Sequence, residues 1–172
     1  LSVKKRVNAD EARYEGYELS LRTGEWKGLS GFGQLSWIRG EVLPSEKDAE
    51  TVAADRVPPL MGAAGLRWRG GERAWALSTW VEGASAQDEL GPGDQTDLRI
   101  CQDPNDPGQT LGEACRGSDG WTTLNAAVSV KPIPSLRTSL SIKNALDASY
   151  RIHGSGYDAP GFDARLTADY KF

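Results

Sequence analysis

The segment 162–172 alternates strictly between apolar and polar side chains. Its apolar positions are Phe162, Ala164, Leu166, Ala168, Tyr170 and Phe172. The positions between them carry Asp163, Arg165, Thr167, Asp169 and Lys171. A period of two residues predicts a β-strand with one apolar and one charged face. Such a strand is expected in a transmembrane β-barrel, where the apolar face contacts lipid and the charged face contacts a water-filled lumen.

The composition of the whole chain resembles that of a soluble domain. Its 172 residues are 26% charged, with a net charge of -4 and a mean hydropathy of -0.50. No apolar run approaches the roughly 20 residues that a membrane helix needs. Barrel strands are not detected by this test, because alternation lowers the hydropathy of each strand and polar loops lower that of the whole chain. The slight acidity and the lack of a basic cluster argue against nucleic acid as a partner.

Six further segments alternate in the same way, so we predict an all-β chain. The predicted strands are about 12–22, 29–41, 60–69, 73–86, 121–131, 136–144 and 162–172. In the second strand the alternation does not decide which row faces outward. One row contains Gly31, Gly33, Leu35 and Trp37, and the other contains Phe32, Gln34, Ser36 and Ile38. Between the strands the sequence predicts no helix.

The connections between these strands alternate between short and long. The short ones are 23–28, 70–72 and 132–135, and the long ones are 42–59, 87–120 and 145–161. Tight periplasmic turns and extended extracellular loops are typical of outer-membrane barrels, so we expect the long loops outside the cell. Aromatic side chains near strand ends fit the girdles of such a barrel. They are Trp68, Trp75, Trp121, Tyr170 and Phe172.

Seven strands do not close a bacterial barrel, because such barrels have an even number of strands and lipid tolerates no open sheet edge. We therefore expect an antiparallel segment of a larger barrel. The chain begins at Leu1 within polar sequence and carries no signal peptide, which also suggests a fragment or a processed product.

Several short motifs occur in a fixed order along the chain. Near the C-terminal end they are Asn144-Ala145-Leu146-Asp147, Tyr150-Arg151, Pro160-Gly161 and a terminal aromatic strand. Upstream they are Asn8, Glu11-Ala12-Arg13, Gly16-Tyr17-Glu18-Leu19 and Pro58-Pro59-Leu60 before Gly62. This order resembles the C-terminal part of TonB-dependent outer-membrane receptors, over nearly the whole chain except the loops. Phe162 departs from the family pattern, which has Arg after Pro-Gly.

The resemblance implies that residues 1–172 are a C-terminal segment, about seven strands, of a 22-stranded, plugged barrel in the bacterial outer membrane. The plug domain and the segment that contacts the TonB complex precede the barrel in this family and are absent from this chain. The implied partners are outer-membrane lipid, the remaining strands, the plug and the barrel-assembly machinery. In the family that machinery reads a terminal aromatic, a place that Phe172 and Tyr170 occupy here. No cofactor is implied.

The function implied by the resemblance is energy-coupled uptake of a scarce, large nutrient such as a siderophore or other metal chelate, haem, cobalamin or a glycan. A general porin or adhesin-like barrel is the first alternative. A secreted carbohydrate-binding β-sandwich is the second, because it also explains alternation and a disulfide.

Both cysteines, Cys101 and Cys115, lie in the longest loop. We expect a disulfide, because the periplasm and cell surface are oxidising. A thiolate metal pair is the alternative, although no histidine is nearby to complete it. The same loop is acidic, which suggests either a solvated loop with turns or a calcium site. The acidic and amide residues are Asp94, Asp97, Asp103, Asn105 and Asp106. We expect no metal.

His153 is the only histidine. It does not complete a hydrolase motif, and the chain offers no paired acid and base, so we expect no catalysis. We take His153, Tyr157 and Arg151, which share one long loop, as candidate ligand contacts. On the strands we expect five basic residues to face the lumen and to contact a plug, a substrate or opposite charges across strands. They are Arg67, Arg69, Arg137, Lys143 and Arg165.

Overall fold

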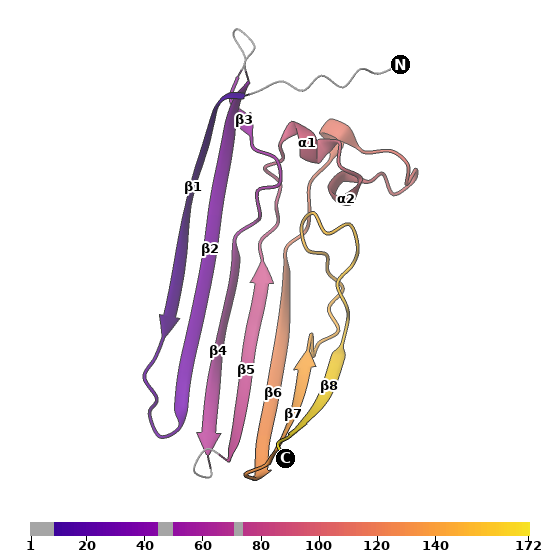
Figure 1. Ribbon diagram of the computed structural model, residues 1–172. Helices are drawn as coiled ribbons and strands as arrows, with labels where there is room; N and C mark the ends of the chain where they lie inside the picture. Colours follow the sequence, from indigo (N-terminus) through magenta and orange to yellow (C-terminus); the bar gives the residue numbers. More distant parts are fainter. Residues whose placement is uncertain (1–8, 45–49, 71–73) are drawn as a thin grey trace.

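The computed structural model describes residues 9–44, 50–70 and 74–172. They form one antiparallel sheet in the order β1-β2-β4-β5-β6-β7-β8, with the short β3 paired to β2 (Figure 1). The strands are β1 (Ala9–Arg22), β2 (Leu29–Pro44), β3 (Val52–Ala53), β4 (Met61–Gly70), β5 (Trp75–Ala84), β6 (Trp121–Ile133), β7 (Leu136–Lys143) and β8 (Asp163–Tyr170). All seven predicted strands are therefore confirmed. Asn8, residues 45–49 of the first long loop and residues 71–73, which include the predicted start of β5, lie outside the described residues.

The register aligns the apolar rows of all long strands on one face of the sheet. A single ladder of directly opposed residues crosses six strands, from Leu29 through Trp68, Leu77, Val128 and Leu140 to Leu166. Tyr17 lies opposite Trp37, and Leu19 opposite Leu35. The row of β2 that contains Leu35 and Trp37 therefore belongs to the apolar face, which the sequence alone did not decide.

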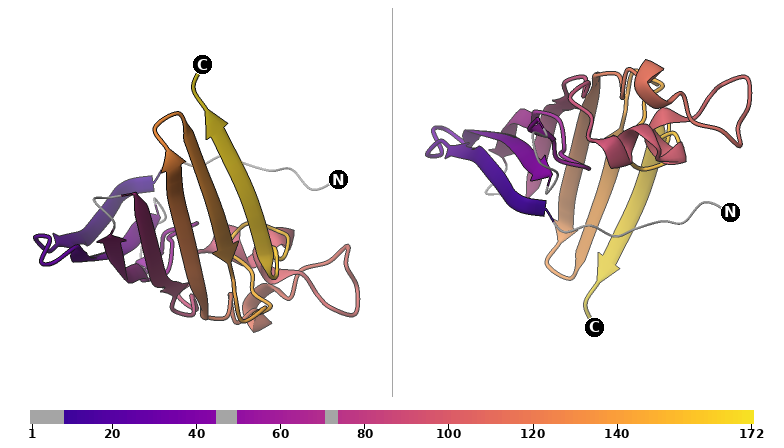
Figure 2. Two further views of the ribbon diagram at one scale, coloured as in Figure 1. Left: turned by 90° about the horizontal axis from the view of Figure 1, so that it is seen from below. Right: turned by 90° about the horizontal axis from the view of Figure 1, so that it is seen from above.

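Among the described residues, no second layer covers this apolar face. Its ladder is open to the surroundings, with Leu166 73% exposed and Trp68 50% exposed. The buried hydrophobic residues of the described chain are Ala54, Val57 and Cys101, and all three lie in loops. Seen end-on, the sheet bends into an open arc (Figure 2). A β-sandwich packs a second sheet against such a face, so the sandwich alternative is wrong.

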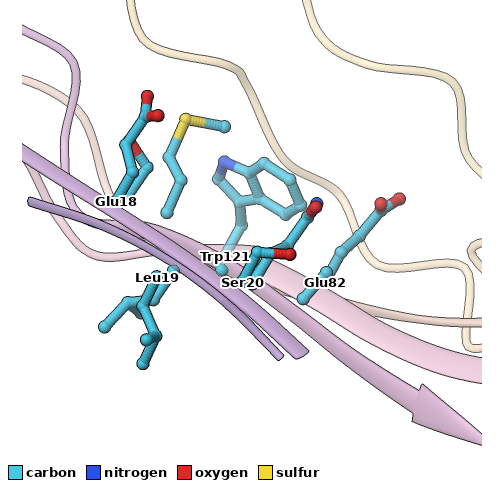
Figure 3. Close-up of a pocket in the computed structure, with 12 residues that line it drawn as sticks. Glu18, Leu19, Ser20, Glu82 and Trp121 are labelled. Carbon is cyan, nitrogen blue, oxygen red and sulfur yellow. The ribbon is translucent and has the colours of Figure 1, made fainter. Parts of the chain in front are cut away.

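Aromatic residues cluster at the end of the sheet that carries the short turns. Trp68 packs edge-on against Trp75 with ring centroids 5.1 Å apart, and Tyr170 packs against Phe172 at 5.2 Å. Trp121 differs, and its predicted place in a girdle is wrong. It lies opposite Ala84 at the loop end and projects to the polar face with Glu82, whereas Leu19 projects to the other side (Figure 3).

The prediction that no helix interrupts the strands is wrong in the longest loop. This loop contains α1 (Pro92–Gln95), α2 (Leu98–Cys101) and the 3-10 turn η1 (Gly112–Ala114). Each is about one turn long, so none shows the apolar periodicity by which a helix is recognised. A local signal does exist, since the Asp97 side chain caps α2 by accepting a hydrogen bond from the Arg99 N–H. Among the described residues, no helix has the length and hydropathy to cross a membrane.

Candidate functional site

The three long loops gather at the end of the sheet opposite the short turns (Figure 1). Their described parts are residues 50–60, 85–120 and 144–162, which we call the loop cluster. The middle loop contacts both of the others, so the cluster is connected through side chains as well as through the sheet. These contacts define the geometry of the site.

A buried carboxylate joins the first two loops. Asp94 is 1% exposed, and both of its carboxylate oxygens accept the backbone N–H of Arg56 at 3.0 Å. The contact is reciprocated, because Asp55 accepts the backbone N–H of Gly93 at 2.7 Å. Gln87 adds a third link by donating its side-chain amide to the Val57 carbonyl at 2.7 Å. Each loop therefore supplies hydrogen-bond partners to polar groups of the other loop.

Asp97 adds an ion cluster beside this clamp. It accepts the Arg99 backbone N–H and Nε–H, both at 2.9 Å, and lies 3.3 Å from a terminal nitrogen of Arg56. Hydrogen bonds from Arg99 hold the pKa of Asp97 well below its usual range. Asp97 therefore stays ionised throughout the pH range in which the protein would work.

Asp94→Asn is expected to loosen the first two loops by about 1–3 kcal/mol, because the carboxylate accepts the N–H groups of both Arg56 and Gly91, and an amide NH₂ in place of one oxygen would face one of these donors. Hydrogen–deuterium exchange of residues 50–60 and 91–97 measures the effect. Asp88→Asn is the matched control, since Asp88 is exposed in the same loop. Equal protection in both variants would show that the carboxylate does not clamp the loops.

Cys101 and Cys115 form a disulfide with a Cα–Cα distance of 5.4 Å. The predicted disulfide is confirmed, and the thiolate metal pair is wrong because the two sulfurs are bonded to each other. The bond closes a segment that projects from the rest of the cluster (Figure 2). Within it Asp103 accepts the Asn105 N–H at 2.8 Å and Asp106 accepts the Gly108 N–H at 3.3 Å. Both aspartates therefore stabilise consecutive turns, as the solvated-loop interpretation predicts.

The base of the third loop is fixed by Asn144, which is 2% exposed. Its side chain donates to the Ala148 carbonyl at 2.8 Å and accepts the Ala148 N–H at 2.9 Å. Its own N–H donates to the Asn125 side chain at 3.0 Å. Asp147 then accepts the N–H of Phe162, the residue before β8, at 2.8 Å. The Asn-Ala-Leu-Asp motif thus holds the two ends of the loop together.

The three candidate ligand contacts do not converge on one point. Arg151 pairs with Asp158 across its own loop, with Nε–H donating at 2.9 Å. His153 reaches the middle loop, where its Nδ1 lies 2.9 Å from the Ser118 hydroxyl. Tyr157 is 71% exposed. Their assignment as ligand contacts remains a prediction.

A cavity of about 320 Å³ lies between the middle and third loops. Its lining includes Arg99, Ser118, Tyr150, Arg151, His153 and Asp158. Ser118 was not predicted from the sequence, and Tyr150 was noted there only as part of the Tyr150-Arg151 motif. The Tyr150 ring lies 4.4 Å from that of Trp121, so this contact joins the loop cluster to the polar face of the sheet.

The polar face forms a groove of about 590 Å³ (Figure 3). The polar-face side chains that line it include Glu18, Ser20, Gln34, Met61, Glu82 and Trp121. The register also places the five predicted basic residues on this face. They lie opposite small or acidic residues, namely Arg67 opposite Ser78, Arg69 opposite Ala76, Arg137 opposite Asp169, Lys143 opposite Asp163 and Arg165 opposite Ser141. Opposite charges in direct register stabilise neighbouring strands.

Comparison with known proteins agrees with this architecture. Residues 4–145 match the family described as TonB dependent receptor-like, beta-barrel. Among solved structures, the chain is similar to the copper transporter OprC, with a TM-score of 0.69 and 18% sequence identity. The similarity covers 94% of this chain and 23% of that one, so this chain spans less than a quarter of that transporter's length. No curated protein matches. The chain belongs to the TonB-dependent receptor-like β-barrel family, and its sheet is a fragment of such a barrel.

Proposed function

We propose that this chain supplies wall strands and loops to an outer-membrane receptor that takes up a scarce, large nutrient by TonB-dependent, energy-coupled transport. The observation that carries the proposal is the uncharged ladder from Leu29 to Leu166, uncovered on one face of a sheet whose other face is polar. In a membrane barrel the apolar face contacts lipid and the polar face contacts an aqueous lumen, so each face has a suitable environment. Family membership of the chain supports the same function.

In this orientation the loop cluster, with the long loops predicted at 42–59, 87–120 and 145–161, lies outside the cell. Tyr170 and Phe172 then lie at the periplasmic end, where the barrel-assembly machinery would read them. The free edges of β1 and β8 pair with strands that this chain does not contain. The plug domain and the TonB contact belong to other parts of the parent protein.

The transported nutrient is proposed only as a class, namely a siderophore or other metal chelate, haem, cobalamin or a glycan. In this arrangement the loop cluster would capture it first, with Arg151, His153 and Tyr157 as candidate contacts. The five basic residues of the polar face would then meet the plug or the passing nutrient. Copper transport is the described role of OprC. At 18% identity, the similarity to OprC supports the fold alone.

Uptake by cells that express the intact parent protein tests this function. Suitable probes are radiolabelled ferric siderophore, haem and cyanocobalamin, each measured with and without a protonophore. We expect uptake of one probe to fall sharply when the proton gradient collapses, since transport against a concentration gradient needs coupling to energy. A steady open conductance in planar bilayers, with no energy-dependent uptake of any probe, would instead support the porin alternative.

A further inference from the structure

His153 is the point at which the third loop contacts the middle loop through an ionisable group. Its Nδ1 lies 2.9 Å from the Ser118 hydroxyl, which comes from a residue 35 positions away. Its other ring nitrogen, Nε2, is buried and has no hydrogen-bond partner among the described residues. A buried polar atom without a partner is rare in folded proteins.

The charged and titratable groups around His153 come from both loops. The middle loop contributes Arg99 and Asp119 to the shared cavity, and Asp94 and Asp97 act on the imidazole electrostatically. The third loop contributes Tyr150, Arg151 and Asp158. Burial lowers the pKa of His153, and the opposing attraction of Asp94 and Asp97 does not offset it.

We propose that His153 is a pH-sensitive latch that keeps the middle and third loops together when neutral and releases them when protonated. A neutral imidazole carries one N–H, and with that N–H on Nδ1 it donates to the Ser118 hydroxyl oxygen while Nε2 stays buried without a hydrogen. The imidazolium carries an N–H on both nitrogens, and the second N–H has no acceptor where Nε2 lies. The charged ring is therefore more stable in water, which it reaches only if the loops separate.

The direction of the pH effect follows from proton binding. The closed form, in which the pKa of His153 is lowered, binds fewer protons than the open form, in which the ring has its ordinary pKa of about 6.5. Closure is therefore fully favoured above the ordinary histidine pKa. It weakens as the pH falls from that value to the lowered pKa of the closed form, and below the lowered pKa it weakens no further. The imidazole of a lone histidine thus couples the third loop to mild acidification.

The release is confined to one loop. Asp97 keeps its charge because Arg99 lowers its pKa, so the ion cluster with Arg56 persists on acidification. The disulfide between Cys101 and Cys115 does not titrate. The first two loops therefore stay joined while the third separates and exposes the cavity of about 320 Å³. The latch does not depend on which nutrient is transported.

Hydrogen–deuterium exchange of the intact parent protein tests the latch. Protection is compared at about pH 8 and about pH 5.5, which bracket the ordinary histidine pKa, after correction for intrinsic exchange. We expect residues 117–121 and 150–158 to lose about tenfold protection at the lower pH, while residues 50–60 and 91–101 change little. His153→Gln keeps a polar side chain but cannot titrate there, so its protection should not depend on pH.

Ser118→Ala is the companion variant, because it removes the hydroxyl and leaves the titrating ring. It should lower protection already at the higher pH and reduce the further loss on acidification. Unchanged protection in the native protein, or the same pH dependence in His153→Gln, would overturn the proposal. If His153→Gln does not fold, the imidazole C2–H titration followed by NMR decides, since a His153 pKa at or above about 6.5 would contradict the latch.

Discussion

Val128→Arg is expected to cost about 2–4 kcal/mol and to reduce assembly of the barrel, because it places a charge on the lipid face near the middle of β6. Val128 lies opposite Leu77 on one side and Leu140 on the other. Ser129→Arg is the matched control, because Ser129 is the next residue of the same strand and lies on the polar face opposite Ala76 and Ser139. We expect it to cost less than about 1 kcal/mol.

The measurement uses the intact parent protein, whose folded fraction in the outer membrane is read from heat-modifiable gel mobility. Urea titration of the reconstituted protein then gives the free energy of unfolding. Because the two positions share a strand and a neighbourhood, they differ mainly in the face on which the charge lies. Equal losses at Val128 and Ser129 would contradict the assignment of the apolar face to lipid.

The strands were predictable because their signal is local. A period of two residues needs no knowledge of the neighbouring strands, and all seven segments appear in the sheet. The outer face of β2 was not predictable in this way, because one row mixes glycines with large apolar residues and the other mixes large apolar residues with polar ones. Only the pairing of β2 with its neighbours decides it, as in Leu19 opposite Leu35 and Leu29 opposite Trp68. The prediction that Trp121 belongs to an aromatic girdle was wrong for a related reason. Its place at a strand end says nothing about the face to which its side chain projects.

The loop cluster was predictable only in part. The disulfide followed from the cysteine count and the compartment. The clamp by Asp94 did not, because its partner Arg56 lies 38 residues away and nothing in the sequence near Asp94 indicates burial. The contact of His153 with Ser118 is equally distant in sequence, at 35 residues. The sequence therefore predicted which residues are present in the loops but not which of them meet.

The motif residues of the third loop acquire a physical explanation from the structure. Asn144 and Asp147 both have positive φ, at 48° and 53°. Asn and Asp tolerate this region better than other residues with a side chain. Their side chains also cap the loop, toward Ala148 and Phe162 respectively. The motif is thus required by a turn at the loop base, independently of any ligand.

Asn144→Ala is expected to destabilise the protein by about 3–5 kcal/mol, because it leaves the part-buried Ala148 N–H and C=O unpaired and keeps a Cβ at positive φ without the side-chain hydrogen bonds that compensate for it. Asn144→Gly loses the same hydrogen bonds but relieves the backbone, so it should be about 1 kcal/mol less harmful. Urea titration of the reconstituted parent protein measures both, with Asn105→Ala as a control in an exposed turn. Equal destabilisation by Asn144→Ala and Asn144→Gly would show that the backbone conformation does not contribute to the loss. A cost for Asn144→Ala no larger than that of Asn105→Ala would show that the loop base does not depend on this side chain.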